Sequence, residues 1–94
     1  MSIEYCAAIA EEDYDTFRTL LTTSLPNEYD MWVRVRARGK ARAFRERSVV
    51  IDEIDISPQE FSSFCNRMKN SDFSIAALDR CAREKALSRD LAIT

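Results

Sequence analysis

Seven basic side chains occupy fourteen consecutive positions of this 94-residue chain, with Glu46 as the only acid among them. They are Arg34, Arg36, Arg38, Lys40, Arg42, Arg45 and Arg47. Guanidinium groups bind phosphates and carboxylates through paired, charge-assisted hydrogen bonds, so this cluster favours an anionic partner. Trp32 and Phe44 lie among the basic residues, and aromatic rings stack on bases or anchor protein interfaces. The cluster therefore indicates binding to single-stranded nucleic acid or to an acidic protein.

The charge of the flanking segments favours one of these two partners over the other. Residues 1–33 carry a formal charge of −6, residues 34–47 carry +6, and residues 48–94 carry −2. Because the acidic segments repel a polyanion, we expect a protein partner in preference to RNA or DNA. A third interpretation reverses the sign: the acidic start of the first helix would mimic a phosphate backbone and inhibit a nucleic-acid-handling protein.

Two carboxylate clusters are the other groups that could bind a metal or act in catalysis. Glu11, Glu12, Asp13 and Asp15 form the first, and Asp52, Glu53 and Asp55 form the second. Neighbouring carboxylates can hold Mg²⁺ or perform acid/base catalysis. A simpler interpretation is that the first cluster complements a helix dipole and that the second faces the arginines across a sheet. We expect neither a metal site nor a catalytic site.

Missing residue types argue against most enzyme classes. The chain has no histidine, which removes the commonest general base and metal ligand, and its single glycine excludes glycine-rich phosphate loops. Cys6, Cys65 and Cys81 are odd in number and widely spaced, which favours buried, reduced thiols and a cytoplasmic location. We expect no cofactor, and no segment resembles a signal peptide or a membrane span.

The first predicted element is a helix over residues 11–24. Tyr14, Phe17 and Leu21 recur there at helical spacing, and acids load the first turn. Residues 2–10 either extend this helix backwards or form a separate short element, and we favour one long helix. Pro26 ends it, because proline disfavours helical geometry at the residue before it.

A β-hairpin is predicted next, over residues 29–47. From Met31 to Arg38 apolar and polar side chains alternate, and Gly39 suits a tight turn. A two-residue and a three-residue turn give different registers, which remain open. Residues 48–56 would form a third strand, with a bulge near Asp52.

Two helices close the chain. Ser57, Pro58 and Glu60 form a capping box that starts a helix ending near Asn70, and Ser71 or Asp72 caps a last helix over residues 73–88. The pair resembles a helix-turn-helix in outline, but its mixed charges favour an exposed helix face. The fold class is thus α+β: one domain over residues 1–94 in the order α-β-β-β-α-α, a three-stranded antiparallel meander with helices packed on one face.

These patterns together predict a small non-catalytic regulator of adaptor or inhibitor type. Its partner-binding residues would be Trp32 and the seven basic residues, presented on the sheet face opposite the helices. An exposed edge strand would also permit self-association into a homo-oligomer.

Overall fold

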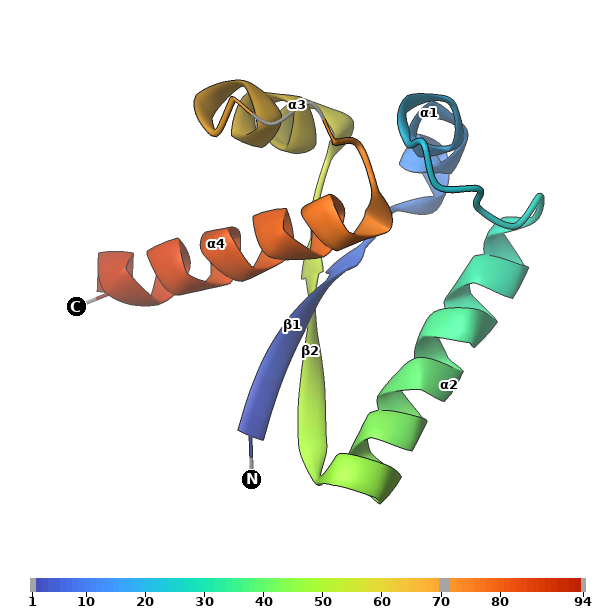
Figure 1. Cartoon of the computed structure of the whole chain (residues 1–94), viewed down its shortest axis with the longest axis vertical. Helices are drawn as coiled ribbons and strands as arrows, with labels where there is room; N and C mark the ends of the chain where they lie inside the picture. The colour runs from blue at the N-terminus through green and yellow to red at the C-terminus, as the bar shows by residue number, and fades with distance from the viewer. Residues whose placement is uncertain (1, 70–71, 94) are drawn as a thin grey trace.

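Two strands and four α-helices make up residues 2–69 and 72–93, the part of the chain that the computed structural model describes (Figure 1). In chain order the elements are β1 (Ser2–Ala8), the short 3-10 helix η1 (Glu11–Asp13), α1 (Tyr14–Leu20), α2 (Tyr29–Arg47), β2 (Val49–Asp55), α3 (Pro58–Arg67) and α4 (Ile75–Ile93). The α+β class is as predicted, but the order of elements is not.

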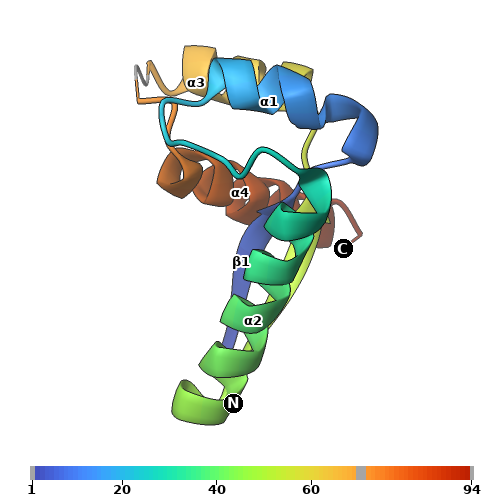
Figure 2. The same cartoon turned by 90° about the vertical axis from the view of Figure 1, so that its right-hand side faces the viewer.

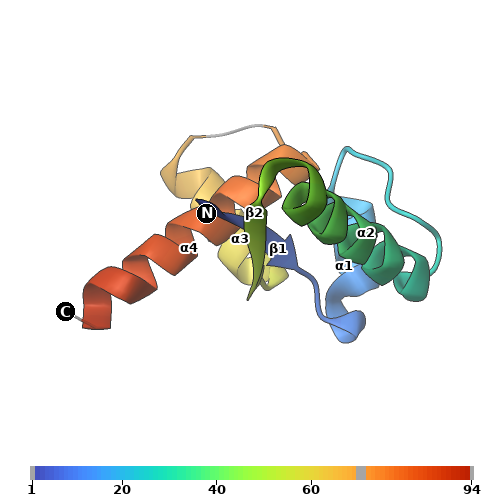
Figure 3. The ribbon, with the colours of Figure 1, turned by 90° about the horizontal axis from the view of Figure 1, so that it is seen from below.

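The two strands form a parallel sheet. Ser2 pairs with Val49 and Ala8 with Asp55, and the Ile56 N–H donates to the Ala8 carbonyl at 3.1 Å. The predicted three-stranded antiparallel meander is therefore wrong. Parallel strands need a long crossover, which η1, α1 and α2 provide here. Seen from below, the sheet lies between α2 on one side and α4 on the other (Figure 3).

The predicted hairpin is wrong because residues 29–47 form the single helix α2. This segment contains six arginines and three alanines, which are good helix formers. Gly39 has no positive φ and makes no turn, so the two alternative hairpin registers do not arise. The helix ends at Ser48, whose φ of 55° is left-handed and whose N–H donates to the Phe44 carbonyl at 3.0 Å.

The first helix is shorter than predicted. Residues 2–8 form β1, so the favoured extension of the helix backwards through residues 2–10 is wrong. Within this strand the Ile3 side chain is 61% exposed. The helical part covers η1 and α1 and ends at Leu20, with Tyr14 and Phe17 buried as expected.

The second half of the chain follows the prediction closely. β2 lies within the predicted strand 48–56, and its pairing with β1 runs without a bulge. The capping box of α3 is confirmed: Ser57 Oγ accepts from the Glu60 N–H at 3.1 Å, and Glu60 Oε1 accepts from the Ser57 N–H at 3.0 Å. The predicted helix end at Asn70 and the cap at Ser71 lie outside the described residues. The last helix begins at Ile75, and Ser74 Oγ accepts from the Ala77 N–H at 3.2 Å, so Ser74 and not Asp72 caps it.

The core lies where α1, α3 and α4 meet the ends of the strands. Phe17, Ile56, Phe61 and Leu78 are almost completely buried, and the Phe17 and Phe61 ring centroids lie 6.2 Å apart. The cysteines are also buried, and all three are free thiols as predicted. α2 contributes little to this core, since Trp32 and Ala43 are its only buried side chains.

Candidate functional site

α2 is attached to the domain along one narrow stripe. An α-helix turns about 100° per residue, so Trp32, Arg36, Lys40 and Ala43 lie on one side of it. Trp32 and Ala43 are each 4% exposed, while Arg36 and Lys40 are partly buried. Most other side chains of this 19-residue helix face solvent. Figure 2 shows the consequence: the length of α2 lies in front of the sheet with its outer side uncovered.

Trp32 belongs to the core. Its ring centroid lies 6.4 Å from that of Tyr14, and the Arg36 guanidinium carbon lies 4.5 Å from the Trp32 ring centroid. At 4% exposure the indole offers almost no surface to a ligand. In this position Trp32 packs the first turn of α2 against the core of the domain.

Arg36 also has a structural role. Its Nη2 donates to Asp79 Oδ1 at 2.7 Å and its Nη1 to Asp79 Oδ2 at 3.4 Å. Asp79 Oδ1 also accepts from the Ala7 N–H at 2.9 Å, so one carboxylate joins α4 to both β1 and α2. The Arg36 Nε is buried and has no hydrogen-bond partner. Both oxygens of the Asp79 carboxylate are therefore occupied by groups of β1 and α2.

Three further cations of the predicted site have ionic partners. Lys40 lies 3.8 Å from Glu53, Arg42 lies 3.1 Å from Glu46, and Arg47 lies 3.4 Å from Glu4. Of the predicted acidic strand, only Glu53 neutralises a basic residue of α2 among the described residues. Exposed pairs of this kind contribute little to stability, but they lower the local positive charge.

The remaining three cations, Arg34, Arg38 and Arg45, have no ion-pair partner among residues 2–69 and 72–93. They lie within about 40° of one another on the helix and span roughly 16 Å along it. The buried residues Trp32 and Ala43 lie about 120–180° away from these three, on the other side of the helix. The structure therefore leaves a stripe of three unpaired guanidinium groups pointing into solvent.

Large apolar side chains flank this stripe on both sides. Met31 and Val35 lie on one side and are 43% and 47% exposed, and Val33 and Phe44 lie on the other and are 46% and 55% exposed. We call the three arginines with these four apolar residues the arginine face. Charged groups interleaved with exposed Met, Val and Phe are typical of a protein interface.

Sequence reasoning placed Met31, Val33 and Val35 inside the core of a sheet and therefore missed them as surface residues. The signal that could have found them was the composition of α2, because arginine and alanine favour a helix over a strand. On a helix, the spacing of 34, 38 and 45 already places three arginines on one face.

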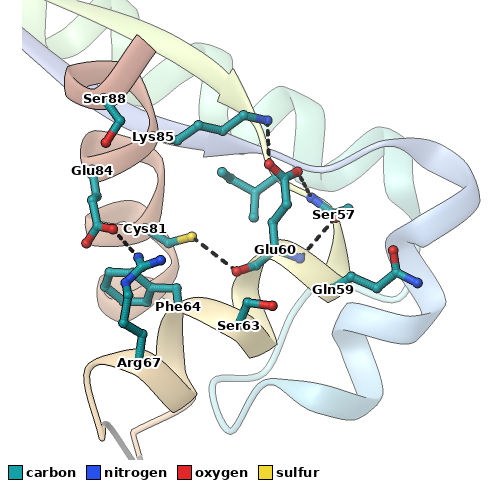
Figure 4. Close-up of a pocket in the computed structure, with 11 residues that line it drawn as sticks. Ser57, Gln59, Glu60, Ser63, Phe64, Arg67, Cys81, Glu84, Lys85 and Ser88 are labelled. Atoms are coloured by element: carbon teal, nitrogen blue, oxygen red, sulfur yellow. Dashed lines mark hydrogen bonds and ion pairs between the residues drawn. The ribbon is translucent and has the colours of Figure 1, made fainter. Parts of the chain in front are cut away.

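A second candidate is the cleft between α3 and α4, which has a volume of about 380 Å³ (Figure 4). Its charged groups bind one another: Lys85 Nζ lies 2.7 Å from Glu60 Oε2, and Arg67 pairs with Glu84. Burial raises the pKa of the Cys81 thiol to about 11, so it is protonated at neutral pH and is a poor nucleophile. The cleft therefore does not present an activated group.

The Glu60 carboxylate in this cleft is held in its charged form. Burial pushes its pKa upwards, but hydrogen bonds from Lys85 and Ser57 outweigh this and lower the pKa below its usual value of 4.5. A carboxylate with a lowered pKa is a weak base, which is the opposite of what a general base requires.

Neither of the two carboxylate clusters forms a metal site among the described residues. In the part of the chain that the structure describes, no three Cys, Asp or Glu side chains gather closely enough to hold a metal ion. None of the described helices is both long enough and apolar enough to cross a membrane.

Comparison with known protein families, with curated proteins and with solved structures found no match in any of the three.

Proposed function

We propose that this protein is a non-catalytic interaction domain, of adaptor or inhibitor type, that binds an acidic protein partner through the arginine face of α2. The observation that carries the proposal is the set of three unpaired arginines on the solvent side of an exposed helix, flanked by four exposed apolar side chains. Such a surface matches a partner helix or loop in which acidic and apolar residues alternate.

The apolar flanks favour a protein over a nucleic acid. Phosphates pair with arginines, but Met31, Val33 and Val35 would gain nothing from contact with a phosphodiester backbone. Stacking of bases needs exposed aromatic rings, and Trp32 is buried, which leaves Phe44 as the exposed ring on α2. An amphipathic protein segment buries the apolar residues and pairs the arginines at the same time.

Energetically, the arginines give specificity and the apolar residues give affinity. The unpaired guanidinium groups attract an acidic partner and speed association at low salt. Burial of the four flanking side chains supplies roughly 25 cal/mol for each Å² of apolar surface removed from water. We therefore expect binding to weaken with salt but to persist at physiological ionic strength.

The test compares two triple variants of equal charge. Arg34→Glu, Arg38→Glu and Arg45→Glu together reverse the arginine face, while Arg18→Glu, Lys69→Glu and Arg89→Glu reverse three exposed cations elsewhere. Arg36 is left unchanged because it binds Asp79 and holds α2 against the domain. A partner captured by the wild-type protein is identified by mass spectrometry, purified and titrated by calorimetry. We expect the first variant to lose about 100-fold in affinity, or roughly 2.7 kcal/mol, and the control to bind normally.

Two results would contradict the proposal. One is a partner that binds the reversed arginine face as tightly as the wild type. The other is a single-stranded oligonucleotide that binds the wild type more tightly than any protein, with a salt slope of about −0.7 per phosphate neutralised. Circular dichroism and thermal unfolding of both variants verify that the helix is intact.

A further inference from the structure

The outer edge of β1, the side away from β2, is an open strand edge. In a parallel pair, alternate residues of a strand turn their main-chain groups towards the partner strand. The Ala8 carbonyl accepts from Ile56 on β2, whereas the Ala7 N–H points away from β2 and donates to Asp79. Ile3 and Tyr5 share the orientation of Ala7, so their main-chain groups point outwards.

Asp79 closes this edge at one end and leaves the other end free. Its carboxylate accepts from the Ala7 N–H at 2.9 Å, as the carbonyl of a neighbouring strand would do. Among the described residues, no group pairs with the outward main chain of Ile3 or Tyr5. In Figure 1 no described helix or strand lies beside the lower half of β1 on the side away from β2. Unpaired strand edges recruit further strands.

Two hollows lie beside this edge, and both are lined in part by Glu4, Tyr5 and Asp79. The first, of about 630 Å³, lies between β1 and α4 and is lined by Ile3, Tyr5, Arg80, Arg83 and Leu87, among others. The second, of about 340 Å³, lies between the strands and α2. It is lined in part by Cys6, Val35, Gly39 and Ile51. Because side chains of a strand alternate between its two faces, an added strand would place them in the two hollows in turn.

The two hollows differ in chemistry. On the α4 side, Arg80 and Arg83 have no ion-pair partner among residues 2–69 and 72–93, and Leu87 beside them is 45% exposed. On the α2 side, Gly39 leaves open space, since a Cβ at this position would have no atom within 4 Å. Unpaired cations favour acidic side chains on the first side. The second hollow is also lined by Glu4, Arg36, Lys40 and Asp79, but these charges have ionic partners, so the free space beside Val35 and Ile51 favours apolar side chains there.

We propose that the outer edge of β1 binds an extended segment of a partner protein as a third strand. The segment alternates acidic residues, which face Arg80 and Arg83, with apolar residues, which fill the hollow beside Gly39. Main-chain hydrogen bonds to Ile3 and Tyr5 hold it, and the Asp79 carboxylate sets where pairing stops. This site lies apart from the three unpaired arginines of the arginine face.

The test uses two synthetic peptides, acetyl-Val-Glu-Val-Glu-Val-Glu-Val-amide and the same peptide with lysine in place of glutamate. Binding is followed by amide chemical shifts in ¹⁵N-labelled wild-type protein. We expect saturable shifts centred on the Ile3 and Tyr5 amides with the glutamate peptide and at least a tenfold weaker response to the lysine peptide. Arg80→Glu with Arg83→Glu should reverse this preference.

Two single variants separate the edge from the hollow. Ile3→Pro removes an outward donor without removing a hydrogen bond to β2, and proline is tolerated at such edge positions. Gly39→Leu fills the hollow on the α2 side, where a side chain has room. We expect each variant to bind the glutamate peptide about tenfold more weakly, or weaker still. Arg34→Glu serves as the control and should leave the Ile3 and Tyr5 shifts unchanged.

Three results would overturn the proposal. Equal binding of the two peptides would show that Arg80 and Arg83 do not select acidic side chains. Absence of shifts at Ile3 and Tyr5 would show that the peptide does not pair with the edge of β1. Concentration-dependent shifts of these amides without peptide, together with a dimer in sedimentation, would identify a second copy of this chain as the occupant instead. Loss of binding at Arg34, Arg38 and Arg45 would not affect any of these readouts, because none of the three lines either hollow.

Discussion

Replacement of Asp79 by alanine should destabilise the whole domain, because this carboxylate joins three elements at once. It accepts from the Ala7 N–H of β1 and binds Arg36 of α2 through both of its oxygens. Removal would leave an unpaired, partly buried guanidinium group, whose Nε already has no partner. It would also leave the Ala7 N–H without an acceptor. α2 would then be held to the domain mainly by Trp32 and Ala43.

The size of the effect follows from burial. Loss of one partner of a fully buried ion pair costs about 3–5 kcal/mol. The side chains of Arg36 and Asp79 are 18% and 29% exposed, so part of this penalty is relieved by water. We therefore expect Asp79→Ala to cost about 2–4 kcal/mol, a large share of the 5–15 kcal/mol typical of a domain. Asp79→Asn retains an acceptor for Ala7 and should cost roughly 1–2 kcal/mol.

The assay is urea unfolding, followed by the fluorescence of Trp32, the single tryptophan of the chain, and by circular dichroism. A double-mutant cycle with Arg36→Met isolates the pairwise energy, which we expect to be about 1–3 kcal/mol. The conclusion that the Arg36–Asp79 pair stabilises the fold is wrong if Asp79→Ala lowers the free energy of unfolding by less than about 1 kcal/mol and the Arg36–Asp79 coupling energy lies within about 0.3 kcal/mol of zero.

Three further predictions concern α3 and the neighbouring core. Ser57→Ala removes the capping box and should cost about 1 kcal/mol in urea unfolding, whereas Ser63→Ala in the middle of α3 serves as the control. Folding lowers the pKa of Glu60, so the contribution of this carboxylate to stability is complete above its usual pKa of 4.5 and is lost as the pH falls through the lowered pKa. As the pH is lowered from 6 to 3, the free energy of unfolding should therefore decrease more steeply for the wild type than for Glu60→Gln. Parallel curves for the two proteins would show that Glu60 makes no such contribution. With a pKa raised to about 11 and 5% exposure, the Cys81 thiol should react with a disulfide reagent at pH 8 only after addition of urea, and rapid reaction of the native protein would contradict its burial.

Local patterns in the sequence predicted the second half of the fold well. Ser57 and Glu60 lie three residues apart and form the capping box by themselves, and the segment from Val49 to Asp55 is rich in the β-branched residues that favour a strand. The first half depends on contacts between distant residues. The short apolar run after Ser2 is a strand because β2 pairs with it, and that pairing is not visible in either segment alone.

The candidate site was predicted by composition but not by geometry. Alternation of apolar and basic residues around Arg34 and Arg36 indicated a half-buried strand, whereas the helix α2 buries only one stripe and exposes the rest. The distinction between structural Arg36 and unpaired Arg34 or Arg38 depends on Asp79, which lies 43 residues beyond Arg36 in the chain. No local pattern carries that information.

The parallel pairing of β1 with β2 also has a consequence for synthesis on the ribosome. Each residue of β1 pairs with one that lies 47 positions later, as Ser2 does with Val49. At a translation rate of about 5–20 residues per second, roughly 2–9 s separate the synthesis of the two strands. During that interval β1 has no strand to pair with, while the crossover helices are already emerging. A chaperone that binds nascent chains therefore has its longest opportunity at β1, before the sheet exists.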